Sequence, residues 1–95
     1  MNITNFKMMD TEHPKGVQAI LAFGDHMELS VVQNEVSYGS KMGLYEIGIF
    51  KDGDMVELPG ITNEGDTIKG FLSEEEVNAI IFKMYSITGK EPVQV

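Results

Sequence analysis

The chain has 95 residues, of which 42% are hydrophobic, and its 15 acidic residues outnumber 7 basic ones to give a formal net charge of −8. All of the basic residues are lysine, and there is no cysteine. The sequence therefore excludes disulfides and thiolate metal sites, and a negative field without guanidinium groups argues against direct binding to nucleic acid or to an anionic membrane. The length and the apolar share fit one folded domain, residues 1–95.

The N-terminal segment, residues 1–16, has neither a basic start nor an apolar run of signal-peptide length. No later segment approaches the ~20 apolar residues of a membrane-spanning helix. We therefore expect a soluble, cytoplasmic protein. Scattered apolar side chains precede Pro14 and Gly16 in residues 1–16, and we predict that this segment forms an N-terminal arm or an edge strand.

Residues 17–72 alternate apolar and polar side chains in the way that is typical of antiparallel strands with one wet face. Gly24 and Asp25 indicate a tight turn between the first two strands, and Pro59 ends the last one. Residues 67–72 are expected as an extended approach to a helix. Four strands are predicted, at 17–23, 26–33, 44–51 and 55–58. The side chains expected to point inward are Val17, Ala19, Leu21, Phe23, Met27, Leu29, Val31, Tyr45, Ile47 and Ile49.

A helix is predicted at the C-terminal end, over residues 73–89. Ser73 and Glu76 have the spacing of a capping box, in which each side chain binds the other residue's backbone amide. Gly89 fits a left-handed cap at the end of the helix. The spacing of the apolar residues predicts one buried stripe, formed by Val77, Ile80, Ile81, Met84 and Ile87.

These elements predict an α+β fold, an antiparallel meander sheet of about four strands with one C-terminal helix packed on one face. A helix is only ~10 Å wide with its side chains, so it covers one face of such a sheet. The opposite face would carry Ile20, Val32 and Phe50. We expect that either the N-terminal arm or a second copy of the chain, as in a homodimer, shields that face.

The residues that carry chemistry in enzymes do not form a recognisable pattern. His13 and His26 are the only histidines, and neither has a second ligand at metal-binding spacing. The stretch "SYGSKMG", residues 37–43, has turn glycines and a lysine but precedes a strand, whereas a phosphate loop follows a strand and opens a helix. We therefore expect no catalytic activity and no cofactor.

The acidic residues cluster between Lys51 and Glu76. One interpretation is a solvated rim that keeps the protein soluble, and another is an acidic lobe that docks onto a basic protein, including by mimicking nucleic acid. A weaker alternative is a divalent-cation site around Asp52, Asp54 and Asp66, although the spacing of an EF-hand is absent. The residues of this predicted acidic lobe are Asp52, Asp54, Glu57, Glu64, Asp66, Glu74 and Glu75.

The segments "SYGSKMGLYEIGIF" and "GDTIKGFLSEEEV" resemble parts of small uncharacterised proteins encoded by tailed bacteriophages, including phages of aquatic bacteria. The resemblance covers roughly residues 27–91. It implies a phage or phage-like origin, and hence the cytoplasm of an infected or lysogenic bacterial host. It brings no activity, cofactor or residue role.

Taken together, the sequence predicts a small acidic protein that acts through protein–protein interaction or self-association. The alternative is an inhibitor that mimics nucleic acid and occupies a basic host protein. The sequence does not name the protein partner, and direct contact with nucleic acid or membrane is not expected.

Overall fold

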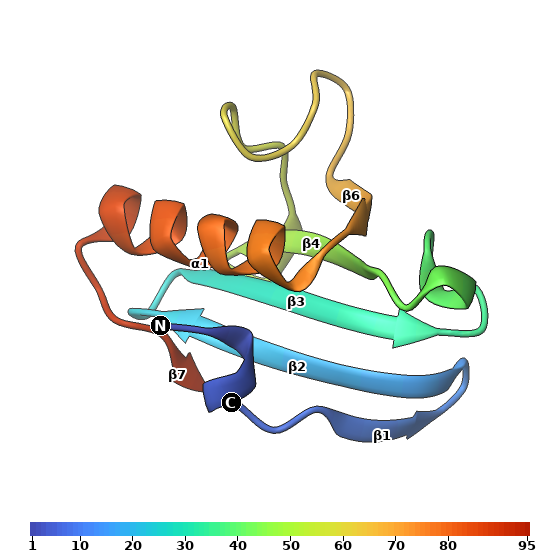
Figure 1. Cartoon of the computed structure of the whole chain (residues 1–95). Helices are drawn as coiled ribbons and strands as arrows, with labels where there is room; N and C mark the ends of the chain where they lie inside the picture. The colour runs from blue at the N-terminus through green and yellow to red at the C-terminus, as the bar shows by residue number, and fades with distance from the viewer.

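The computed structural model describes all residues, 1–95, and has an α+β fold as predicted (Figure 1). Its one α-helix follows six of the seven strands in the chain and precedes the last, and two short 3₁₀ helices precede β1 and β4. The elements are η1 (Ile3–Asn5), β1 (Met9–Glu12), β2 (Lys15–Phe23), β3 (Met27–Asn34), η2 (Ser40–Met42), β4 (Tyr45–Lys51), β5 (Asp54–Met55), β6 (Ile68–Leu72), α1 (Glu74–Thr88) and β7 (Val93–Gln94).

The sheet is an antiparallel meander in the order β1-β2-β3-β4-β5, with β6 also paired to β4 and β7 also paired to β2. In the centre of the sheet, Val31 lies opposite Ala19 on one side and Ile47 on the other, so a buried row crosses three strands. This register sets the apolar positions of all three central strands on the same face.

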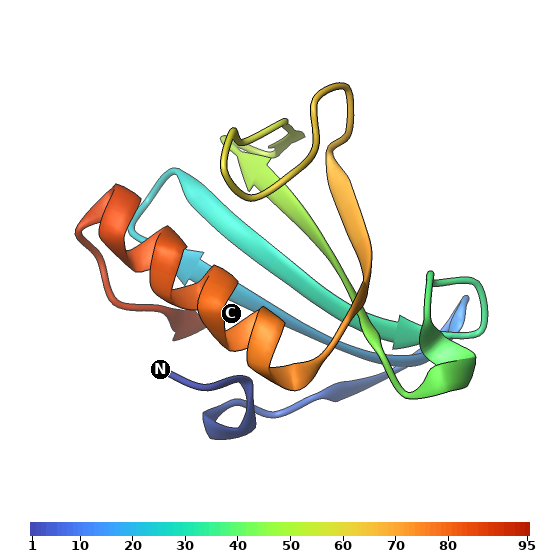
Figure 2. The ribbon, with the colours of Figure 1, turned by 45° about the horizontal axis from the view of Figure 1, so that its top comes forward.

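The hydrophobic core lies between that face and α1, which contacts β2, β3, β4 and β6 (Figure 2). Most of the strand residues predicted to point inward are fully buried, while Val17, Met27 and Tyr45 are half-buried. The helix contributes four buried side chains, Val77, Ile80, Ile81 and Met84.

The predicted helix ends are confirmed. The Glu76 amide donates to Ser73 Oγ at 3.1 Å and the Ser73 amide donates to a Glu76 carboxylate oxygen at 3.0 Å. Gly89 has a φ of 68° and closes the helix. The prediction for Ile87 is wrong, because this side chain is 55% exposed. At 3.6 residues per turn, Ile87 points about 70° away from the stripe, and Thr88 takes the position that continues it.

The N-terminal segment forms both a 3₁₀ turn and an edge strand. Ile3 in η1 is buried, and its amide donates to Asn78 Oδ1 on α1 at 2.7 Å. β1 then pairs with the outer edge of β2, through a turn that contains a cis bond between His13 and Pro14. Because this segment packs at the side of α1 and extends the sheet, it does not shield the face that carries Ile20. That alternative for the cover of the second face is wrong.

The fourth strand, predicted at 55–58, is present but shorter, and it ends at Met55. The chain pairs with β4 over β5, through a tight turn in which Asp52 and Gly53 both have positive φ, and the Val56 amide donates one further bond to the Ile49 carbonyl. It then leaves the sheet, because the Leu58 carbonyl accepts hydrogen bonds from the amides of Ile61 and Thr62 in a turn that buries Ile61 in the core. The true neighbour of β4 along its first half is β6, in the segment expected only as an extended approach.

Candidate protein-binding surface

The pairing of β6 with β4 contains a bulge. Leu72 lies opposite Tyr45, and Lys69 lies opposite Ile47, so two residues of β6 face one residue of β4. One of the two is Phe71, which has a φ of +56°. A bulky residue in the left-handed region is a genuine outlier, and this conformation costs an L-residue about 1–2 kcal/mol.

The bulge directs the side chain of Phe71 away from the core. Phe71 is 57% exposed, whereas the next residue, Leu72, is buried. Bulges commonly re-aim one side chain at a binding site, and strained backbone at such positions persists only where the surrounding structure holds it. An exposed aromatic ring held at an energetic cost is therefore a candidate for a functional residue.

The loop between β3 and β4 docks onto this bulge. The Phe71 amide donates to the Tyr38 carbonyl at 3.1 Å, and the Tyr38 amide donates to the Glu46 carboxylate at 2.6 Å. A Cβ atom on Gly70 would lie 2.4 Å from the Cβ of Tyr38, and Gly39 has a φ of +93°. The two glycines are what allow the loop and the strand to approach each other so closely.

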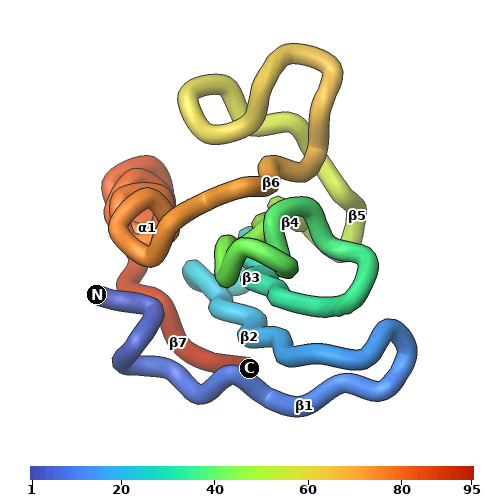
Figure 3. The backbone as a smooth tube through the Cα atoms, turned by 45° about the vertical axis from the view of Figure 1, so that its right-hand side comes forward, coloured from blue at the N-terminus to red at the C-terminus, as the bar shows by residue number.

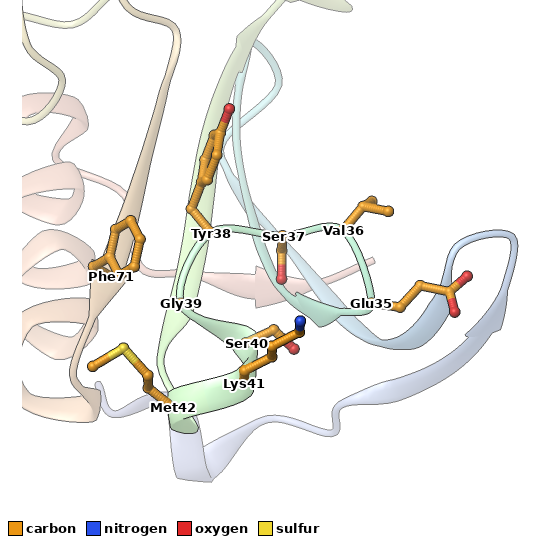
Figure 4. A pocket seen from close by; sticks show the side chains of 9 residues that line it. All are labelled: Glu35, Val36, Ser37, Tyr38, Gly39, Ser40, Lys41, Met42 and Phe71. Carbon is orange, nitrogen blue, oxygen red and sulfur yellow. The ribbon is translucent and has the colours of Figure 1, made fainter.

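The rings of Tyr38 and Phe71 stack, with their centroids 6.2 Å apart and their planes at 23°. Tyr38 is 58% exposed, and two further apolar side chains on the same loop, Val36 and Met42, are more exposed still. Figure 4 shows Phe71 on β6 facing the loop that carries the other three. We name this set, Val36, Tyr38, Met42 and Phe71, the Tyr38–Phe71 surface.

Two shallow depressions share the stacked rings as a common wall. The first, of about 610 Å³, is lined by the loop residues 35–42 together with Phe71. The second, of about 440 Å³, lies against β6 and is lined by Tyr38 and Phe71 and by the polar side chains of Asn63, Asp66 and Lys69. The surface thus combines aromatic and methionine side chains with a polar rim, which is the composition that protein interfaces favour.

The structure separates the predicted acidic lobe into two groups. Five of the seven residues lie in the turn after β4, in β5 and in the loop that projects beyond the sheet before β6 (Figure 1), namely Asp52, Asp54, Glu57, Glu64 and Asp66. Glu74 and Glu75 lie in the first turn of α1, at the other end of β6. The five residues of β6 place about 17 Å between these two groups. Of the seven, only Asp66 lines a depression of the Tyr38–Phe71 surface.

Several acidic groups have local structural partners. Asp52 Oδ1 lies 2.7 Å from Nδ1 of His26, and this contact raises the pKa of the exposed imidazole. A Glu57 carboxylate oxygen accepts from the Gly65 amide at 3.0 Å, which ties the two halves of the projecting loop. Hydrogen bonds from Ser73 lower the pKa of Glu76. These contacts stabilise turns and the helix start.

The cation alternative finds no support in this arrangement. No group of three or more histidine, aspartate or glutamate side chains is placed so that it could hold a metal ion. Asp52 and Asp54 flank a hairpin turn, whereas Asp66 lines the depression beside Tyr38. The structure therefore does not bring the three proposed ligands together.

Sequence reasoning missed the Tyr38–Phe71 surface. The first available signal was Gly70 inside a strand-like segment, since a glycine in a strand often marks a bulge or a close backbone approach. The second signal, a tyrosine next to a glycine in the 37–43 loop, has no meaning until β6 is known to lie beside that loop. Only the tertiary structure shows this neighbour.

Comparison with known proteins adds no relative, because the sequence matches no protein-family model, no curated protein and no solved structure. No helix of the chain has the length and apolar character needed to cross a membrane. The fold and the candidate site together define the class, a small α+β protein with an exposed aromatic surface next to a strained bulge.

Proposed function

We propose that this protein acts by binding another protein through the Tyr38–Phe71 surface, and that it has no catalytic step of its own. The observation that carries the proposal is the conformation of Phe71, which exposes an aromatic ring at a backbone geometry that glycine would adopt without strain. Natural proteins retain such strain mainly where function requires it.

The chemistry of the surface supports a protein partner. Tyrosine, phenylalanine and methionine are enriched at the centres of interfaces, where a few buried aromatic side chains supply most of the binding energy. The backbone that carries the two stacked rings is held in place, because Tyr38 is joined to Phe71 and Glu46 by hydrogen bonds. A rigid surface loses little side-chain entropy when a partner binds.

The net charge favours a partner with positive potential. A chain of charge −8 with no arginine attracts basic proteins at long range, and this attraction raises the association rate more than the final affinity. Asp66 lies on the wall of the second depression, where it could face a basic group next to the aromatic contact. We therefore expect binding that weakens partly, but not completely, as salt is added.

The experiment compares proteins captured from a bacterial lysate, chosen because of the resemblance to phage proteins, by the tagged chain and by two variants. Phe71→Gly removes the ring and leaves the bulge geometry accessible. Phe82→Ser is the matched control, because Phe82 is exposed to the same extent, 58%, but lies on α1. Captured proteins are identified by mass spectrometry at low and moderate salt, and each candidate partner is then purified and titrated.

The expected result is a partner that the parent chain and Phe82→Ser bind with equal affinity, and that Phe71→Gly binds at least about tenfold more weakly. Equal affinity of all three forms for every captured partner would contradict the proposal. Capture that survives Phe71→Gly but is lost on reversal of Asp66, Glu74 and Glu75 to lysine would instead support the acidic mimic of nucleic acid.

A further inference from the structure

β6 is an edge strand with a free outer side. It pairs with β4 only, and β5 pairs with the same side of β4 further along, so no strand of the sheet lies beyond β6. Figure 3 shows β6 running from the projecting loop to the start of α1, beside the loop between β3 and β4. The unpaired backbone groups of such an edge can accept a further strand.

The register of the β4–β6 ladder fixes which backbone groups of β6 point outward. The Thr67 carbonyl accepts from the Ile49 amide of β4 at 3.4 Å, so the next amide, that of Ile68, points away from β4. Bonded and non-bonded pairs alternate in an antiparallel ladder, so Lys69 exchanges hydrogen bonds with β4 and Ile68 does not. The amide and carbonyl of Ile68 and the amide of Gly70 therefore point outward. No backbone hydrogen bond from a turn or loop uses these three groups.

The outward groups lie along the second depression of the Tyr38–Phe71 surface. Four consecutive residues of β6, 68–71, line this depression of about 440 Å³ together with Tyr38, Asn63 and Asp66. Tyr38 packs against Gly70, whereas Asp66 precedes β6 in the chain. An extended segment laid along β6 would therefore pass from an acidic end of the depression to an aromatic end.

We propose that the partner segment that binds the Tyr38–Phe71 surface is an extended peptide, which adds to the outer side of β6 as a further strand. This inference rests on the proposed function and names the conformation of the partner. Ile68 can exchange two hydrogen bonds with one residue of the peptide, and the Gly70 amide can donate a third bond two residues further along. A helix could not make these bonds, because its own backbone groups are already paired.

The surroundings of β6 define the side chains of the peptide. The peptide residue opposite Gly70 would lie next to Tyr38, because a Cβ on Gly70 would touch the Tyr38 side chain. An apolar side chain is therefore favoured there. Four residues away on the same face of the peptide, ~13 Å along an extended chain, the next contact is Asp66, which favours lysine or arginine. Lys69 also lines the depression, but it alternates to the opposite face of β6, beside Ile47.

A second copy of this chain fits the edge less well than a short basic peptide does. The free stretch of β6 ends at the bulge of Phe71, where the Tyr38 carbonyl accepts the Phe71 amide. Bulges and short edges are features by which natural sheets avoid pairing with their own copies. Two chains that each carry a charge of −8 also repel, whereas a basic peptide is attracted.

The first test measures hydrogen exchange of single amides in the full chain by nuclear magnetic resonance. In the free chain, the amides of Ile68 and Gly70 should exchange rapidly, while the Lys69 amide, which is bonded to β4, should exchange slowly. Equal protection of all three amides would show that the edge is closed and would overturn the proposal. Protection of Ile68 that rises with protein concentration alone would show that a second copy occupies the edge, and would also overturn it.

The second test uses a displayed library of random nine-residue peptides as the probe. Selected peptides should carry an apolar residue and a lysine or arginine four residues apart, and their binding should protect the amides of Ile68 and Gly70. N-methylation of the peptide residue that donates to the Ile68 carbonyl should weaken binding at least tenfold, and N-methylation of either neighbouring residue should not. A library without a binding peptide, or equal sensitivity of neighbouring residues, would contradict an added strand.

The third test changes the chain itself and separates the two proposals. Ile68→Pro removes one outward amide but no bond to β4, and proline is tolerated where an edge amide faces solvent. It should bind the selected peptides at least tenfold more weakly than the parent chain, and Ile68→Val, the matched control, should bind them equally well. Should Ile68→Pro fail to fold, as seen by circular dichroism, N-methylation of the peptide still decides.

The outcomes for Ile68→Pro and Phe71→Gly can be told apart. Loss of peptide binding with Phe71→Gly but not with Ile68→Pro would overturn the added strand and leave the proposed function in place. Loss with Ile68→Pro but not with Phe71→Gly would support the added strand and contradict the function proposed for the aromatic rings. Loss with both variants is the expected result.

Discussion

The strain at Phe71 can be measured by comparing two variants that both remove the ring. In an ordinary strand, glycine is less stable than alanine by roughly 0.5–1 kcal/mol, because glycine loses more backbone entropy on folding. At a φ of +56° an alanine keeps the left-handed penalty of about 1–2 kcal/mol, which glycine avoids. The two effects oppose each other, and the second is larger. Phe71→Gly is therefore expected to be more stable than Phe71→Ala by about 1 kcal/mol.

The assay is urea unfolding monitored by circular dichroism. The unfolding free energy of each variant should fall with urea concentration at the same slope. At a slope of 1–3 kcal/mol per molar urea, the difference corresponds to a midpoint higher by about 0.3–1 M for Phe71→Gly. Ala79→Gly is the control, because Ala79 is exposed inside α1, where glycine should cost about 1 kcal/mol. If Phe71→Gly proved less stable than Phe71→Ala, the backbone there would not be strained, and the main support for the proposed function would disappear.

Three further predictions concern stability. Gly70→Ala should lower the free energy of unfolding by roughly 1–3 kcal/mol, since its Cβ would overlap the docked loop; an unchanged unfolding midpoint would show that the loop is free to move. Ser73→Ala should cost about 1 kcal/mol, because the Glu76 amide loses the hydroxyl oxygen to which it donates; an unchanged unfolding midpoint would contradict the capping box. His26→Gln should lower the free energy of unfolding below about pH 6.5, where the imidazolium is paired with Asp52. The difference in unfolding free energy between the parent chain and this variant should vanish as pH rises through the raised pKa of His26 in the folded state. A difference that grows at high pH would refute the pairing.

The local elements of this protein were readable from the sequence because their causes are local. The alternation of residues 17–51 follows from the two-residue period of a strand, and it set the three central strands and the inward face correctly. The start of α1 followed from a capping box within four residues, Ser73 to Glu76. The helix stripe was readable except at its last turn. Ile87 and Thr88 lie three and four residues after Met84, and either spacing can continue an apolar stripe.

The errors came from pairings between segments distant in the chain. Residues 55–58 have strand-like chemistry, but the turn at Leu58 and the burial of Ile61 end the strand at Met55. β6 then occupies the edge of β4, about twenty residues later in the chain. No periodicity within a short window distinguishes these two outcomes, because the free energy that selects one of them comes from contacts with α1 and the core.

The sequence alone determined the fold class, the central strands, the capped helix and the acidic charge, since each depends on neighbouring residues or on composition. Only the tertiary structure decided which face stays uncovered, how the acidic residues divide between two ends of β6, and where Tyr38 meets Phe71. These two rings are more than thirty residues apart in the chain, and each is unremarkable in its own segment. They form a surface because the bulge in β6 and the loop before β4 are brought together by the packing of the whole sheet.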